Sequence, residues 1–170
     1  MISQAMQDAL NKQINEELYS AYVYASMANY FEFRSLKGFA NWMRNQSEEE
    51  LGHARRFVTF MNDRGGRVIL DAVKAPRIDW ESPLDVFENA YAHECHISAC
   101  INDLSTMAIN EKDHASHAFL EWFVTEQVEE ESTADEIVQQ LKLMEGAPGG
   151  LFLMDRELAQ RSTPKEPTPA

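Results

Sequence analysis

The sequence contains little glycine and proline, with 7 Gly and 6 Pro among 170 residues. These residues cluster at Gly65-Gly66, over residues 76–83, over residues 146–150 and in the last seven positions. The stretches between the clusters are rich in helix-forming residues and contain no runs of alternating β-branched residues. This pattern predicts long helices and argues against a β-sheet.

Cysteine is also scarce, and the chain has no long hydrophobic run. Cys95 and Cys100 lie on one expected helix and face different directions, so we expect two small packed thiols and no disulfide. No apolar stretch approaches the roughly 20 residues of a membrane span, and the first residues lack the apolar core of a secretion signal. We therefore expect a soluble, cytoplasmic protein in a reducing compartment, with no membrane partner.

The sequence also contains few positively charged residues. The chain has 15 Lys+Arg against 28 Asp+Glu, which gives a formal net charge of −13. A chain this acidic repels nucleic-acid phosphates and anionic lipid headgroups, so no nucleic acid is expected as a partner, whereas cations are suitable partners. With 44% hydrophobic residues, a chain of 170 residues can form the core of one domain without disulfides.

Apolar residues recur at steps of three and four in four stretches, which predicts helices over residues 5–33, 36–64, 83–110 and 113–145. Ser82 is expected to cap the third helix ahead of Pro83. The short gaps near Ser35 and Lys112 make each pair of helices antiparallel, whereas residues 65–82 are long enough to travel the whole bundle. The expected fold class is all-α, a four-helix bundle with one long crossover.

A short fifth helix is expected at residues 151–161, LFLMDRELAQR, after a break rich in glycine and proline. Its first four residues are apolar, so this tip should be buried against its own bundle or against copies of itself in an oligomer. We expect one domain over residues 1–161 and a flexible, Pro-rich tail over residues 162–170.

Ionisable and amide residues interrupt each of the four apolar stripes. In an antiparallel pair of helices, residues equally far from the turn lie at one level. Glu17 lies about 17.5 residues before the first turn, and Glu50 and His53 lie about 15.5 and 18.5 residues after it. The same arithmetic about the second turn brings three more residues to this level: Glu94, Gln127 and Glu130. All six side chains can therefore meet in one layer in the middle of the bundle.

Taken singly, each of these glutamates is more typical of a solvated helix face. Together they would be buried charges, which cost several kcal/mol per ion unless a cation or a proton compensates them. Carboxylates with one imidazole, projecting from four helices, are the ligand set of a di-iron or di-manganese centre. Glu50-x-x-His53 is matched by Gln127-x-x-Glu130, so the second metal lacks an imidazole and should be held more weakly, which suits iron that passes through. Three glutamates one residue off the stripe could extend the site toward one face: Glu49, Glu126 and Glu129.

The segments FANWMRNQSEEELGHARRF and FLEWFVTEQVEEE, with Glu17, Glu94, the crossover and the last helix, resemble the bacterial non-haem ferritins over nearly the whole chain. The resemblance implies a ferritin-like di-iron domain and an iron storage protein with ferroxidase activity. Such a protein oxidises Fe(II) with O₂ or H₂O₂ and deposits hydrated ferric oxide in a hollow homo-oligomeric shell of twenty-four subunits. The fifth helices would meet at fourfold axes of the shell.

The resemblance also implies roles for single residues. Glu17, Glu50 and His53 would bind the first iron, with Glu50 bridging to the second. The second iron would be bound by Glu94 and Glu130, with Gln127 completing the pocket and Tyr24 beside the centre. A third iron site would consist of four glutamates: Glu49, Glu126, Glu129 and Glu130.

Two departures from neighbouring families limit the alternatives. Haem-binding bacterioferritins carry a methionine where this chain has Gly52, so no haem is expected. Rubrerythrin-like peroxidases usually carry a cysteine-rich module, which this chain lacks. A di-iron peroxidase or oxidase that retains its iron, and a metal-free helical interaction protein, remain the competing hypotheses. Iron uptake far beyond two ions per chain would separate storage from both.

Overall fold

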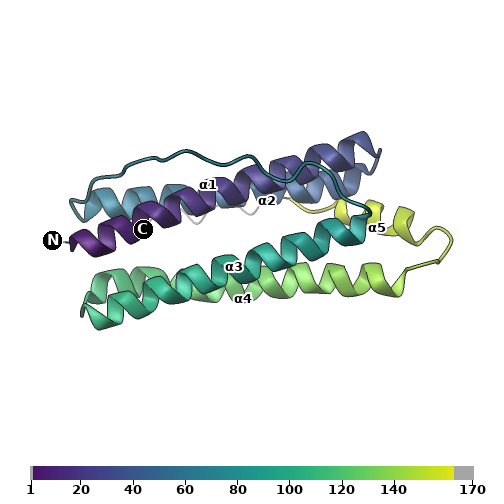
Figure 1. The fold of residues 1–170 in the computed structure, drawn as a ribbon. Helices are drawn as coiled ribbons and strands as arrows, with labels where there is room; N and C mark the ends of the chain where they lie inside the picture. The colour runs from purple at the N-terminus through teal and green to yellow at the C-terminus, as the bar shows by residue number, and fades with distance from the viewer. Residues whose placement is uncertain (1, 163–170) are drawn as a thin grey trace.

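In the computed structural model, which describes residues 2–162, the chain forms an elongated bundle of four long helices with a short fifth helix at one end (Figure 1). The helices are α1 (Gln4–Phe33), α2 (Lys37–Asp63), α3 (Pro83–Asn110), α4 (His114–Leu143) and α5 (Gly150–Leu158). The described residues include no strand. The predicted all-α fold class is thus confirmed, and the bounds of the four long helices agree with the expected ones to within two residues.

Local signals at the helix ends explain where these helices start and turn. The Ser82 hydroxyl accepts a hydrogen bond from the Asp85 N–H at 3.1 Å, and Pro83 occupies the first turn of α3, as expected. The side chains of Ser3 and Asp113 cap α1 and α4 in the same way. Ser35 and Lys112 adopt the left-handed conformation, with φ of 60° and 56°, and so close the two short turns that reverse the chain.

The long connection between α2 and α3 runs beside α1 from one end of the bundle to the other, so α2 and α3 are parallel (Figure 1). Polar side chains of α1 bind its backbone. Asn11 accepts from the Ile69 N–H at 2.8 Å, Ser26 donates to the Arg77 carbonyl at 2.7 Å, and the Tyr30 hydroxyl donates to the Trp80 carbonyl at 2.9 Å. The predicted crossover is confirmed, and these bonds satisfy backbone groups that form no ladder of their own.

The fifth helix is shorter than predicted, and most of its apolar tip is exposed. It ends at Leu158 rather than at Arg161, because the chain there tightens into turns and amide side chains of α2 bind the terminal carbonyls. Met154 and Leu158 are buried, whereas Leu151, Phe152 and Leu153 are 39%, 65% and 65% exposed. The chain's own bundle therefore leaves most of the apolar tip uncovered. Of the predicted tail, residues 163–170 lie outside the described residues.

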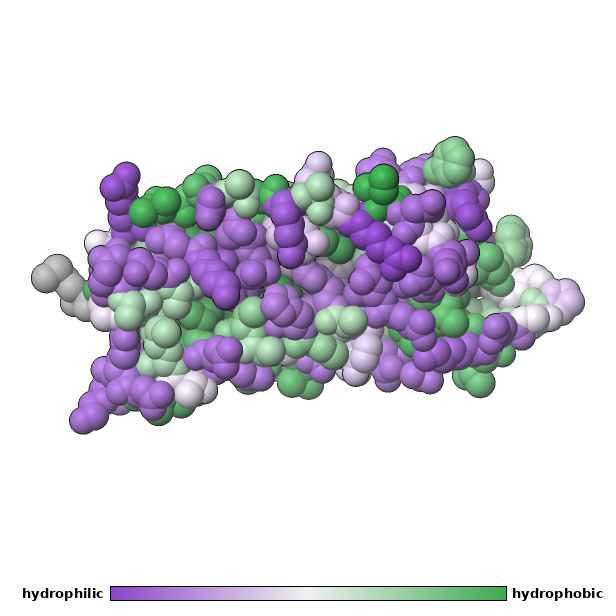
Figure 2. Space-filling view, in the orientation of Figure 1, coloured by the Kyte–Doolittle hydropathy of each residue, from purple (hydrophilic) through white to green (hydrophobic). Residues whose placement is uncertain are grey.

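The core consists of two apolar clusters, one in each half of the bundle. Phe31, Phe39 and Phe87 belong to the cluster in the half that holds α5, and Phe57 and Phe123 belong to the other. Hydrophilic residues dominate the face of the bundle seen in Figure 2, with apolar side chains scattered among them. Within the described residues, no helix combines the length and the apolar character needed to cross a membrane. Between the two clusters lies a layer of buried polar side chains.

Candidate metal centre

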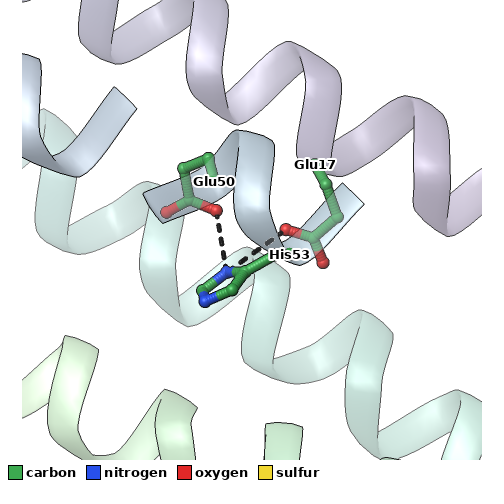
Figure 3. Close-up of side chains that lie close together, drawn as sticks. All are labelled: Glu17, Glu50 and His53. Atoms are coloured by element: carbon green, nitrogen blue, oxygen red, sulfur yellow. Dashed lines mark hydrogen bonds and ion pairs between the residues drawn. The ribbon is translucent and has the colours of Figure 1, made fainter. Parts of the chain in front are cut away.

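The first half of this layer consists of side chains from α1 and α2. Glu17, Glu50 and His53 are all buried, and their carboxylate and imidazole groups converge in Figure 3. The His53 Nδ1 lies 3.3 Å from the Glu50 Oε2 and 3.8 Å from the Glu17 Oε2. One ligand atom from each residue falls within 4.8 Å of the other two, which is close enough for all three to bind one metal ion. The hairpin arithmetic therefore places these three residues correctly.

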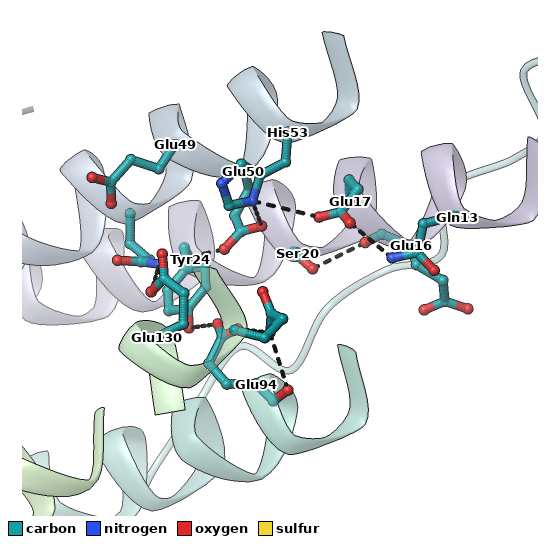
Figure 4. A network of polar contacts seen from close by, with 12 residues as sticks. Gln13, Glu16, Glu17, Ser20, Tyr24, Glu49, Glu50, His53, Glu94 and Glu130 are labelled. Carbon is teal, nitrogen blue, oxygen red and sulfur yellow. Dashed lines mark hydrogen bonds and ion pairs between the residues drawn. The ribbon is translucent and has the colours of Figure 1, made fainter. Parts of the chain in front are cut away.

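The second half of the layer consists of side chains from α3 and α4. Glu94 and Gln127 are buried, and the Gln127 Nε2 donates to the Glu94 Oε2 at 3.2 Å. Glu130 is buried too, and the Gln46 Nε2 of α2 donates to its Oε2 at 2.6 Å and to the Glu50 Oε1 at 3.4 Å. Amide donors thus connect the two halves into the network drawn in Figure 4.

Tyr24 of α1 belongs to the apolar cluster in the half that holds α5, and its hydroxyl reaches the polar layer. It is fully buried, and its hydroxyl donates to the Glu94 Oε1. Burial, and next the negative charge of Glu94, raise the pKa of Tyr24 well above its usual value, so the phenol stays protonated and remains a donor. The resemblance implies that Tyr24 lies beside the centre, and its hydroxyl contacts Glu94, one of the expected ligands.

Electrostatics in the layer favour a positive charge. Burial is the first cause that raises the pKa of Glu17, Glu50, Glu94 and Glu130 above the usual value, and the repulsion of neighbouring carboxylates adds to it for Glu17, Glu50 and Glu130. Such carboxylates accept either protons or a cation.

One buried acceptor in the layer has no hydrogen-bond donor among the described residues. It is the Glu17 Oε2, the same atom that faces His53. A buried acceptor without a partner costs about 1–3 kcal/mol, and native structures usually avoid it. A hard divalent cation with carboxylate and imidazole ligands would satisfy this atom, so the donor set fits iron or manganese.

The three glutamates expected to extend the site are placed differently from one another. Glu126 has a carboxylate oxygen within 4.8 Å of ligand atoms of both His53 and Glu130, which forms a second possible metal group. Glu49 is half-buried and bonds to Arg161 at 2.5 Å, and burial raises its pKa although Arg161 opposes the shift. Glu129 is exposed. The structure thus brings Glu126 to the layer and gives Glu49 a cationic partner.

Sequence reasoning missed two residues that contact the layer. The Gln13 Nε2 donates to the Glu17 Oε1 at 2.7 Å, and the spacing of four residues on one helix is a signal that could have identified it. Arg161 contacts Gln46 and Glu49, and no sequence spacing predicts this, because it depends on the path of the chain after α5.

A surface cleft reaches the layer between α3 and α4. Its volume is about 350 Å³, and Tyr91, Ser98, Gln127 and Glu131 are among its lining residues. The other histidines lie outside the layer. His96 and His114 are exposed, and the half-buried His93 bonds through its Nε2 to the Ser20 hydroxyl at 2.7 Å.

Comparisons with known proteins agree with the fold described above. The family model of the ferritin-like domain matches residues 7–144. A bacterial non-heme ferritin of Bacteroides fragilis (strain 638R) is 43% identical over 161 residues, covering 95% of this chain and 100% of that protein. One from Staphylococcus epidermidis is 40% identical over 162 residues, covering 95% and 98%.

A solved structure shows the same architecture. The open pore ferritin of Archaeoglobus fulgidus superimposes with a TM-score of 0.94 at 50% identity, covering 95% of this chain and 100% of that one. The family model, the relatives and the solved structure agree over nearly the whole chain. The chain therefore belongs to the ferritin family, and specifically to its bacterial non-haem members.

Proposed function

We propose that this protein stores iron and is a ferroxidase, which oxidises Fe(II) at the buried layer of carboxylates. Glu17, Glu50 and His53 bind the first Fe(II), Glu94 and Glu130 bind the second, and Glu50 bridges the two. The observation that carries the proposal is the buried Glu17 Oε2, which faces His53 and has no donor among the described residues. A buried carboxylate without a compensating charge is unfavourable, so a cation bound at this oxygen would stabilise the site.

The reaction follows from the charge of the site. Two Fe(II) ions supply two electrons, which together with two protons reduce one O₂ to H₂O₂, while the iron becomes Fe(III). The carboxylates favour the more highly charged product, because their negative charges are poorly solvated in this layer. Tyr24 and Gln127 hold Glu94 by hydrogen bonds and so keep its oxygens in place while ions enter and leave.

Storage requires that the oxidised ions leave the layer and that the protein encloses space for them. We infer that Fe(III) moves toward the α2/α4 face, where Glu49, Glu126, Glu129 and Glu130 form a third iron site, and mineralises as hydrated ferric oxide. The exposed tip of α5 needs a partner, and a homo-oligomeric shell of twenty-four subunits would supply it from other copies of the same helix. The free thiols Cys95 and Cys100 suit the reducing cytoplasm.

The test is to add Fe(II) in air at several hundred ions per assembly and to follow iron and protein through size exclusion. Iron should elute with a large protein species, in an amount far above two ions per chain. The double variant Glu50→Ala/His53→Ala should lose rapid oxidation, whereas Glu48→Ala, an exposed neighbour on α2, should keep it. Uptake that stops near two ions per chain would contradict storage and favour an enzyme that retains its iron.

A further inference from the structure

The segment after α5 brings a cation to the edge of the proposed metal centre. The Arg161 Nη2 donates to the Glu49 Oε2 at 2.5 Å and to the Gln46 Oε1 at 2.8 Å. Its guanidinium also lies 4.3 Å from the centre of the buried Trp42 ring. Ion pairing, hydrogen bonding and cation–π contact therefore hold one side chain against α2.

The backbone of this segment is anchored independently of the guanidinium. The Nδ2 atoms of Asn41 and Asn45 each donate to the Arg161 carbonyl at 3.0 Å. The Asp155 carboxylate accepts from the Gly38 and Phe39 N–H groups at 2.8 and 3.1 Å, which fixes α5 to the start of α2. Because the backbone is held by these bonds, the Arg161 side chain can leave Glu49 without release of the segment.

Contacts of Arg161 extend into the metal layer through one side chain. Gln46 accepts from Arg161 with its Oε1, which leaves its Nε2 to donate to Glu130 at 2.6 Å and to Glu50 at 3.4 Å. The guanidinium thus fixes which end of the Gln46 amide faces the carboxylates. Arg161 is a positioning residue, since it acts on the layer through Gln46.

Glu49 is also one of the glutamates proposed to bind a third iron. In this structure its Oε2 is already paired with a positive charge, and a divalent ion at the same carboxylate would meet repulsion from the guanidinium. The Arg161 Nη1 is buried and has no hydrogen-bond partner among the described residues, so the docked guanidinium is incompletely paired and can be displaced.

We propose that Arg161 competes with a third metal ion for Glu49 and so controls the passage of ions from the di-metal layer to the α2/α4 face. With Arg161 docked, the chain holds two ions and the third position is closed. When Arg161 swings away, Glu49 becomes free to bind an ion together with Glu126. This inference rests on the proposed function, because it assumes that the layer binds two ions.

Binding of Zn²⁺, which undergoes no oxidation, tests this proposal without reference to activity. Metal-free wild type and Arg161→Gln are dialysed against a series of free Zn²⁺ concentrations, and bound zinc is counted per chain. We expect wild type to hold two ions where Arg161→Gln holds three, with at least about a tenfold gain in affinity for the third ion. Anomalous diffraction from zinc-soaked crystals should place the added ion beside Glu49.

Matched variants separate this competition from a general effect of charge. Arg156→Gln removes the same charge from an exposed position on α5 and should bind two ions, as wild type does. Arg161→Gln/Glu49→Gln should return to two ions, because the proposed ligand is gone. Arg161→Lys retains the positive charge near Glu49 and should stay close to wild type, because both contacts of Arg161 come from one nitrogen and a lysine ammonium also has several donors.

The outcomes distinguish this inference from the proposed function. Two ions in wild type and still two in Arg161→Gln would overturn the inference alone. No bound ion in either protein would overturn the proposed function and the inference together. Three ions in wild type at the same free zinc, or three in Arg156→Gln, would show that Arg161 does not compete for the third position.

Discussion

Replacing Glu17 with glutamine should stabilise the metal-free protein at neutral pH. Glu17 is fully buried, and burial, followed by repulsion from Glu50, raises the pKa of its carboxyl well above the usual value of 4.5. Glutamine has almost the same size, can accept the hydrogen bond from Gln13, and carries no charge at any pH. The variant therefore reproduces the protonated state of the wild-type side chain.

The pH dependence has a defined sign and an upper limit. Because the folded state binds this proton more tightly than the unfolded chain, the stabilisation by protonated Glu17 is complete below about pH 4.5 and is lost as the pH rises through the raised pKa of the folded state. One such group changes the free energy of unfolding by at most about 1.4 kcal/mol per pH unit. At about 2–4 °C per kcal/mol for a chain of this size, the melting temperature of Glu17→Gln should gain up to about 3–6 °C on wild type per pH unit.

Thermal unfolding of chelator-treated protein at pH 5, 6 and 7, followed by circular dichroism, measures this difference. Glu48 is an exposed glutamate on α2, so Glu48→Gln is the control. Its melting temperature should differ from that of wild type by the same amount at each pH. Saturating Zn²⁺ should reverse the order, because a ligand at 100 times its dissociation constant stabilises by about 2.7 kcal/mol and Glu17→Gln lacks one ligand. A difference in melting temperature between wild type and Glu17→Gln that stays constant from pH 5 to 7 would refute the reasoning.

Three further substitutions test other parts of the structure. Tyr24→Phe deprives the buried Glu94 carboxylate of a donor, so it should cost about 1–3 kcal/mol and weaken zinc binding, as measured by melting and dialysis. Ser82→Ala removes the cap of α3 and should lower stability by about 1 kcal/mol with no change in iron uptake. Gly38→Ala would place a Cβ 1.6 Å from the Asp155 carbonyl oxygen, so α5 should shift and be cleaved faster by trypsin, and an unchanged cleavage rate would contradict the tight approach.

Much of the fold could be predicted because its signals are local. Helix periodicity, the Ser82 cap and the short turns act within a few residues, and they define four helices and their directions. The level of Glu17, Glu50, His53 and Glu94 followed from counting residues back from the turns, because a helix rises by a constant amount per residue. The depth of a side chain in a hairpin is therefore available from the sequence.

The contacts at the end of the chain could not be predicted in this way. The expected fifth helix continued to Arg161, but amide donors on α2 bind the terminal carbonyls and turn the chain across that helix. Glu49 was expected to be a free ligand one residue off the stripe, yet it is paired with Arg161. Both results depend on how a short helix packs against a distant one, and no periodicity within either segment reports that packing.

The two halves of the layer differ in how they would respond to the loss of an ion. In the α3/α4 half, the Glu94 and Glu130 carboxylates accept hydrogen bonds from the Gln127 and Gln46 amides, which remain in place when an ion leaves. In the α1/α2 half, the Glu17 Oε2 has no donor among the described residues, so departure of an ion there leaves an unsatisfied buried oxygen. Emptying the α3/α4 half therefore costs less free energy than emptying the half that contains His53. We therefore expect the second ion to exchange before the first.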